Sequence, residues 1–276
     1  FWLHYFDPHR PYAPPENLLP AVEPPPFIGT AFTEFRKIRG GYFFPSLAEM
    51  EWIKTLYDAE VRHVDDNIGR LIDLLKQLGI YNESLIILTS DHGEEFWEHG
   101  GYEHGHTLYN ELLWVPLIIK LPGSTTTGQI HSLVDITSIT PTILEACHIE
   151  YDANYLSVPS LSACWDPRRQ AAPGRPLVST GLLYYEDRES VRLGAYKYIR
   201  SLVRGREELY NLDDDPAEWF SIVRSSPEKV GQAKKILNEE RARAQYLREH
   251  YGIVSSEGAI LDEETLEKLR SLGYID

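Results

Sequence analysis

The segment Ser90–His106, SDHGEEFWEHGGYEHGH, concentrates side chains that can bind metal ions or transfer protons. It holds four of the ten histidines of this 276-residue chain, together with one aspartate and four glutamates. Asp91 and His92 open the segment directly after an apolar run, and Gly93 allows a tight turn. A carboxylate beside an imidazole on such a turn can bind one divalent cation.

A lone Asp-His pair is more often a cap followed by a surface histidine than a metal site. The histidines that follow on glycine-rich turns change this balance: His99, His104 and His106. Several imidazoles on one short segment can converge on a single centre. We therefore favour a metal-centred site built from this segment.

A second cluster, HYFDPHRPY, lies near the start of the chain and carries Asp7 and His9. Pro8 and Pro11 flank the histidine and restrict its backbone. A rigid backbone suits a catalytic side chain, because a displacement of about 1 Å can cost about 100-fold in rate. Spacing alone leaves a catalytic histidine and a proline-rich surface turn equally open.

The elements that would position these clusters are those of an α/β fold. Apolar residues recur at three- and four-residue intervals over 47–78, interrupted only by Glu60, and predict a helix that ends before Gly79. SLIILTS (84–90) and WVPLIIKLP (114–122) have the continuous apolar composition of buried strands, which predicts a parallel sheet. Residues 1–6 predict a further strand and residues 137–147 a further helix. Both clusters would then follow carboxyl ends of strands, where such sheets bind ligands.

Three regions are expected. Residues 1–170 form a catalytic α/β domain, residues 171–255 a smaller α+β subdomain, and residues 256–276 a polar tail with a short helix. In the subdomain, PLVSTG, SVRLG, YKYIRSL and EELYNL predict short antiparallel strands. Helices are expected at 216–223 and 227–251.

Composition excludes some partners. The net charge of −15, from 27 basic and 42 acidic residues, argues against nucleic acid, which is bound by surplus lysine and arginine. A small anion remains compatible, since a few cations can create a local positive site. No apolar run reaches the roughly 18 residues of a membrane span. Cys147 and Cys164 lack metal-type spacing.

Long stretches of the chain resemble the sulfatase family of the alkaline phosphatase superfamily. HYFDPHRPYAPP resembles its Pro-His-x-Pro segment, and residues 57–100 resemble its long helix, strand and metal-binding turn. GHTLYNELLWVPLIIKLPG resembles the segment that follows, and VRLGAYKYIRS with ELYNLDDDPAEWFSI resembles the small C-terminal domain. The likeness covers roughly residues 1–237. It implies an alkaline-phosphatase-like, mostly parallel sheet flanked by helices, with a smaller C-terminal antiparallel sheet plus helix.

The resemblance also implies roles for individual residues. Asp91 and His92 would bind the catalytic divalent cation. Ca²⁺ is the first expectation. Many sulfatases have asparagine where this chain has His92, so Mn²⁺, Mg²⁺ and Zn²⁺ are alternatives. His9 would contact the sulfuryl group and help manage the nucleophile's proton, and Asp7 would support His9 or its loop at the substrate side. His104 lies near the position of a sulfate-binding lysine. Because the loop is one residue longer than the lysine-bearing form, His106 is a rival for that role.

The chain departs from the family in one essential element. Sulfatases use a formylglycine nucleophile made from a cysteine, or sometimes a serine, in a Cys-x-Pro-x-Arg motif, together with an earlier pair of aspartates, and neither cysteine here has that context. We expect both elements upstream of Phe1, so that this chain holds about half of an active site and is inactive alone. The substrate would be a small sulfate ester, and family habit suggests a periplasmic or extracellular location.

Two other functions stay open. A relative of the same superfamily could hydrolyse phosphate or phosphonate esters or transfer phosphoryl groups, and some such enzymes bind two metal ions about 4 Å apart. A degenerate, non-catalytic member would only bind an anionic ligand.

Overall fold

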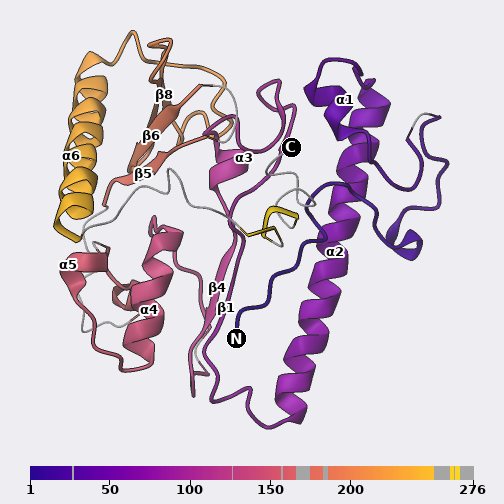
Figure 1. Ribbon diagram of the computed structural model, residues 1–276, viewed down its shortest axis with the longest axis horizontal. Coiled ribbons are helices and arrows are strands. Elements are labelled where there is room, and N and C mark those ends of the chain that lie inside the picture. The colour runs from indigo at the N-terminus through magenta and orange to yellow at the C-terminus, as the bar shows by residue number, and fades with distance from the viewer. Residues whose placement is uncertain are drawn as a thin grey trace.

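The computed structural model describes residues 1–26, 28–125, 127–156, 158–165, 175–182, 186–251, 262–263 and 265–267. A long helix forms one side of the molecule and a sheet with its own helix forms the other, with a two-stranded ladder between them (Figure 1). This arrangement of helices and strands confirms the predicted α/β class. No helix in the described ranges is long and apolar enough to cross a membrane.

The long helix α2, Leu47–Gln77, confirms the helix predicted from the apolar stripe. It begins with a capping box, in which Ser46 and Glu49 satisfy each other's backbone N–H groups. It ends where Gly79 adopts a φ of +71°, the conformation that terminates many helices. The stripe is buried near the start of the helix, so α2 is anchored there.

The proline-rich loops before α2 pack against this anchored part. They include η1 (Glu16–Leu18) and α1 (Phe35–Arg39), and they supply half of a core cluster: Tyr12, Ile28, Phe32, Trp52, Ile53 and Leu56. Glu60, which interrupts the apolar stripe, accepts a hydrogen bond from the backbone N–H of Ala13 at 2.7 Å. Glu60 therefore attaches the loop that carries His9 to α2.

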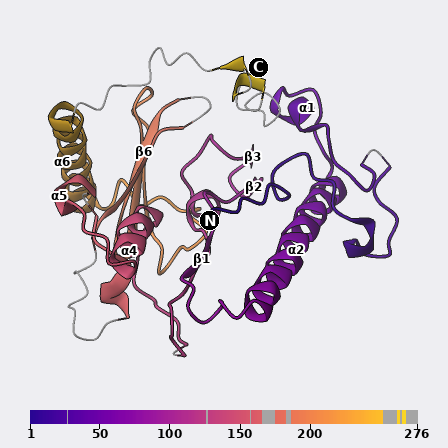
Figure 2. The same cartoon turned by 60° about the horizontal axis from the view of Figure 1, so that its bottom comes forward.

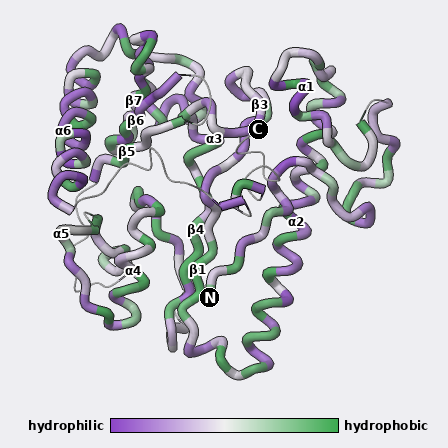
Figure 3. The backbone as a smooth tube through the Cα atoms, viewed as in Figure 1, coloured by the Kyte–Doolittle hydropathy of each residue, from purple (hydrophilic) through white to green (hydrophobic). Residues whose placement is uncertain are grey.

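The central ladder consists of β1 (Ile86–Thr89) and β4 (Leu117–Lys120). Both strands confirm the sequence prediction and stand out as apolar (Figure 3). Their expected parallel orientation is wrong for this pair, because Ile86 pairs with Lys120 and Thr89 with Leu117, which is antiparallel. A parallel return needs a crossover, usually a helix of its own. The connection here contains only a four-residue helix, α3 (Asn110–Leu113).

Between β1 and β4 the chain folds into a short hairpin. Its strands are β2 (Glu95–Phe96) and β3 (Tyr102–Glu103), paired antiparallel. The turned view places this hairpin near the upper end of α2 (Figure 2). All four histidines of the segment Ser90–His106 thus lie on the connection between β1 and β4, in or next to this hairpin.

After β4 the chain forms a group of short helices: η2 (Ile136–Ser138), α4 (Ile139–Ala146), α5 (Ala153–Leu156) and η3 (Leu161–Cys164). The helix predicted at 137–147 is confirmed as α4. Cys147 and Cys164 are both free thiols.

The C-terminal sheet is antiparallel, with the order β5-β6-β7-β8. Its strands are Leu177–Thr180, Arg188–Leu193, Tyr196–Ser201 and Glu207–Asn211. Helix α6, Pro227–Tyr251, packs its buried residues Val230, Ala233 and Leu237 on one face. Leu108 and Tyr109, which follow the histidine segment, pack in another cluster with sheet residues such as Ile199. The predicted antiparallel sheet plus helix is therefore confirmed, and it abuts the histidine loop.

Two predicted elements are wrong. Residues 1–6 form no strand, because no neighbouring strand pairs with them among the described residues, and Phe1 and Trp2 are exposed. Residues 216–223 form turns rather than a helix, since Asp215 binds the backbone N–H groups of Trp219 and Phe220 and closes a loop instead. The helix expected in the tail lies mostly outside the described residues.

Candidate active site

The turn after β1 presents Asp91 and His92 side by side. The side chain of Asp91 is 65% exposed, and its Oδ2 lies 3.8 Å from Nε2 of His92. Nδ1 of His92 lies 2.7 Å from the carbonyl oxygen of Gly93. Because a carbonyl only accepts, Nδ1 carries the proton and Nε2 keeps the lone pair with which an imidazole binds a metal.

Gly93 has a steric reason to be glycine. A Cβ atom at this position would lie 2.0 Å from the carbonyl oxygen of Glu111. The backbone N–H of Gly93 also donates to the carbonyl of Leu112 at 2.9 Å. The turn is therefore pressed against the start of α3, which fixes the direction of His92.

The donor chemistry of this turn fits a divalent cation, since a carboxylate and an imidazole nitrogen face the same space. Within the described ranges no group of three or more His, Cys, Asp or Glu side chains is arranged to hold a metal ion. Asp91 and His92 could supply two ligands of a larger set.

Three imidazole rings meet beside this turn. The ring centroids of His92 and His104 are 4.0 Å apart, and those of His104 and His9 are 5.5 Å apart. His104 thus lies between the other two. Residues from the N-terminal loop, the β1 turn and the β3 turn converge, as the two clusters in the sequence suggested.

His9 sits in a partly buried position. Its Nδ1 lies 2.7 Å from the carbonyl oxygen of Arg10, which directs the proton to that nitrogen. Burial, together with the positive charges of Arg10 and His104, lowers the pKa of His9 below 6.5 despite that hydrogen bond. His9 is therefore a neutral imidazole at neutral pH.

Glu94, which the sequence analysis did not single out, joins two parts of the site. Its Oε1 lies 2.8 Å from Nδ1 of His104, and its Oε2 accepts a hydrogen bond of 2.6 Å from the hydroxyl of Tyr12. A signal existed in the sequence: adjacent residues in extended chain point to opposite sides, so Glu94 and Glu95 must face different partners.

His106 has a different carboxylate partner. Its Nε2 lies 2.9 Å from Oε2 of the fully buried Glu95, and its ring also forms a hydrogen bond with the backbone of His104. Burial lowers the pKa of His106, but the hydrogen bond and charge of Glu95 outweigh this and raise it above 6.5. The ring contacts described above therefore join His104 to His9 and His92, whereas the carboxylate partner of His106 is Glu95.

His99 also has structural partners. Its Nδ1 lies 2.6 Å from Oε1 of Glu111, its Nε2 lies 3.1 Å from the carbonyl oxygen of Glu218, and its ring stacks on Tyr109 at 3.6 Å. Glu218 in turn forms a buried ion pair with Lys197 at 2.8 Å. His99 thus fastens the histidine loop to the C-terminal sheet.

Asp7 faces α2 rather than the turn that carries Asp91 and His92. Its Oδ1 lies 3.8 Å from Nε2 of His63. The backbone N–H of His9 donates to the carbonyl of Phe6 at 2.8 Å, which closes the turn that contains Asp7. This placement suits the expected support of the His9 loop.

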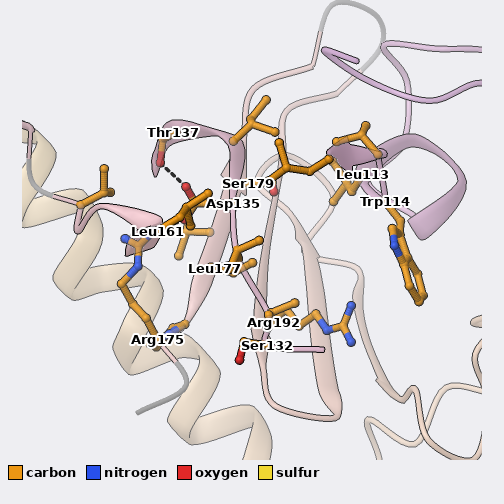
Figure 4. Close-up of a pocket in the computed structure, with 18 of the residues that line it drawn as sticks. Leu113, Trp114, Ser132, Asp135, Thr137, Leu161, Arg175, Leu177, Ser179 and Arg192 are labelled. Carbon is orange, nitrogen blue, oxygen red and sulfur yellow. Dashed lines mark hydrogen bonds and ion pairs between the residues drawn. The ribbon is translucent and has the colours of Figure 1, made fainter. Parts of the chain in front are cut away.

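A large hollow lies between β4, the short helices and the C-terminal sheet (Figure 4). Its volume is about 2570 Å³, well above the roughly 300–1,000 Å³ of small-molecule pockets. Near Asp135, which is paired with Arg175, and near Trp114 and Arg192 its walls are mixed in polarity. Asp91 and His92 are among its lining residues, so the hollow is continuous with the turn that carries them.

Comparison with known proteins shows the family and the fold. The family profile described as Sulfatase matches residues 1–149. Arylsulfatase K of Bos taurus is 28% identical over 74% of this chain and 40% of its own length, and an arylsulfatase of Clostridium perfringens is 26% identical over 68% and 40%. The chain therefore spans less than half of these curated relatives.

Two solved structures share the fold. BT4656 in complex with its substrate D-glucosamine-2-N,6-O-disulfate has a TM-score of 0.60 and 23% identity, covering 77% of this chain and 45% of that one. The phosphonate monoester hydrolase of Agrobacterium radiobacter has a TM-score of 0.62 and 21% identity, covering 72% and 43%. The expected alkaline-phosphatase-like fold is confirmed.

Proposed function

Since the chain belongs to the sulfatase family, we propose that the full-length protein hydrolyses small sulfate esters at the histidine cluster described above. The observation that carries the proposal is the convergence of His9, His92 and His104 from three separate segments. Imidazoles gathered beside the turn that carries the Asp91 carboxylate suit the binding of a sulfate group together with a cation. The disulfated substrate of BT4656 and the two arylsulfatase relatives support a sulfate ester as the substrate class.

Asp91 and His92 would hold the divalent cation. When bound, such an ion neutralises negative charge on the sulfate oxygens. Ca²⁺ remains the first expectation from the family, while the imidazole of His92 also suits Mn²⁺ or Zn²⁺, and Mg²⁺ is a further alternative.

His9 and His104 would transfer protons and stabilise the leaving group. Hydrolysis breaks the S–O bond to the alcohol, so the departing oxygen must gain a proton and the attacking oxygen must lose one. His9 is neutral at neutral pH and can accept a proton at Nε2, because its Nδ1 donates to Arg10. His104 presents its Nε2 on the side of the ring away from Glu94.

The nucleophile is assigned to a residue outside these 276. A formylglycine needs a Cys-x-Pro-x-Arg motif, and neither Cys147 nor Cys164 has one. Both thiols also lie on the short-helix region after β4 rather than on the β1 turn. The histidine cluster would therefore bind the sulfate group and protonate the leaving oxygen, and a residue in another part of the protein would attack the sulfur.

The test is hydrolysis of a chromogenic aryl sulfate by the full-length protein. We expect His9→Ala and His104→Ala each to lower kcat by about 100-fold or more, the usual contribution of a proton-transferring group. His131→Ala, at an exposed position, serves as the matched control and should keep full activity. Full activity in both site variants would remove His9 and His104 from the mechanism.

Phosphonate or phosphate ester hydrolysis is a second candidate. It is favoured by the phosphonate monoester hydrolase among the structural neighbours and by the imidazole at position 92 of the cation turn. Matched aryl sulfate, aryl phosphate and phenylphosphonate esters should be compared by kcat/KM. A preference for the phosphorus esters by tenfold or more would replace the sulfatase proposal.

A further inference from the structure

Glu94 lies in the interior between two chain segments and uses both carboxylate oxygens. Its side chain is only 5% exposed, and that of His104 is 7% exposed. Oε1 lies 2.8 Å from Nδ1 of His104, and Oε2 lies 2.6 Å from the hydroxyl of Tyr12. Tyr12 is completely buried.

The direction of these hydrogen bonds follows from Tyr12. Burial, reinforced by the negative charge of Glu94, raises the pKa of Tyr12 well above 10, so the phenol keeps its proton and donates it. A carboxylate that accepts from Tyr12 at Oε2 accepts from the imidazole at Oε1. His104 is thereby held with Nδ1 protonated and with Nε2 on the opposite side of the ring, toward the cluster.

We infer that Glu94 is a positioning residue for His104, and that Tyr12 holds Glu94 in place. The inference rests on the role proposed above for His104. Because Tyr12 follows His9 by three residues, the same carboxylate also fixes the His9 loop relative to the β3 turn. Glu95 and His106 form a second carboxylate–imidazole contact on the same loop, through Nε2 of the ring rather than Nδ1.

A matched control exists in the C-terminal sheet. Glu208 is also buried and accepts hydrogen bonds from Tyr109 at 2.7 Å and Tyr210 at 3.0 Å. Replacing it disturbs a buried tyrosine–carboxylate contact without touching any of the three clustered histidines. A general loss of stability should therefore affect the Glu94 and Glu208 variants alike.

Kinetics of the full-length protein give the first test. We expect Glu94→Ala to lower kcat by about 10- to 100-fold, the usual effect of losing a residue that orients a functional imidazole, with KM within about threefold of wild type. Glu94→Gln keeps an acceptor and should recover part of the loss, and Glu208→Ala should leave kcat unchanged. In a His104→Ala background, Glu94→Ala should have no additional effect. If Glu94→Ala lowered kcat further in that background, by the same factor as in the wild type, the inference would be overturned.

Nitrogen NMR of selectively ¹⁵N-histidine-labelled protein gives a test that does not depend on activity. The wild type should show His104 with its proton on Nδ1, and Glu94→Ala should redistribute it toward Nε2, whereas Glu208→Ala should not. An unchanged tautomer in a folded Glu94→Ala or Glu94→Gln protein would refute the positioning role. If the wild type hydrolysed no sulfate ester, the proposed function would fail while this measurement still decided the role of Glu94.

Discussion

Arg10 and Glu103 form a buried ion pair directly beside His9 and His104 in the sequence. Nε of Arg10 lies 3.3 Å from Oε1 of Glu103, and the two side chains are 3% and 1% exposed. The guanidinium also lies over the ring of Phe35 at 4.9 Å. The backbone segments that carry His9 and His104 are therefore tied together by a contact that does not involve the histidines.

Arg10→Met should destabilise the protein strongly. Removing one partner of a buried ion pair leaves an uncompensated charge and costs about 3–5 kcal/mol. Because Arg39 also binds Glu103, we expect a value near the lower end of that range. The free energy of unfolding in urea measures the effect. Arg36→Met, on an exposed side chain of the same region, should change it by less than about 0.5 kcal/mol, and equal effects would contradict the argument.

Asp91→Asn and His92→Ala should weaken binding of a divalent cation to the full-length protein. Asp91→Asn removes the negative charge and His92→Ala the imidazole nitrogen of the two proposed ligands, and loss of a supporting partner alone typically costs about 10- to 100-fold in affinity. Equilibrium dialysis with Ca²⁺ and Mn²⁺ gives the dissociation constants. Asp73→Asn, on the exposed side of α2, is the control. Unchanged binding in both turn variants would place the cation elsewhere.

Gly93→Ala should disturb the cation turn through sterics alone. The new Cβ would meet the carbonyl of Glu111 at 2.0 Å, so the backbone must move, at a cost of about 1–3 kcal/mol. Weaker cation binding should accompany the loss because His92 moves with the turn. Gly69→Ala, within α2 and with no atom within 4 Å of its Cβ, should instead stabilise by about 0.5–1 kcal/mol. Thermal and urea unfolding show whether each substitution lowers or raises the free energy of unfolding.

The Glu95–His106 pair should make stability depend on pH in two windows. The pKa of His106 is raised above 6.5, so its contribution is complete below pH 6.5 and is lost as pH rises through the folded pKa. Although burial raises the pKa of Glu95, its contacts with His106 and two backbone N–H groups hold it below 4.5, so that contribution is lost as pH falls below 4.5.

His106→Gln isolates the upper window. The difference in unfolding free energy between wild type and variant should shrink as pH increases from about 6 to 9. His99, which pairs with Glu111 and also has a raised pKa, cancels in this difference. A difference that stays constant with pH would show that His106 carries no extra charge in the folded state.

The sequence alone predicted those parts of the fold that depend on local pattern. The stripe of α2, the apolar runs of β1 and β4, and the alternating strands of the C-terminal sheet each carry their signal within a few residues, and each element formed where expected. His9, His92 and His104 were expected at one site and do meet, although the strand that was expected to place His9 there does not form.

What the sequence did not predict depends on distant partners. The orientation of β1 against β4 is set by the connection between them, and the missing strand at residues 1–6 reflects the lack of a described pairing partner. Glu94 and Glu95 look equivalent in the sequence, yet each binds a different histidine, and only the packing of Tyr12 against β2 assigns them.

The β1–β4 ladder also bears on how such a site can diversify. It closes the whole of the segment from Ser90 to Pro116 at both ends, with Thr89 opposite Leu117. The entropy of closing a loop grows only with the logarithm of its length, so adding a residue inside the segment costs little. Insertions there can replace one side chain of the loop by another while the strands keep their register. Specificity and scaffold can therefore evolve at separate rates in this region.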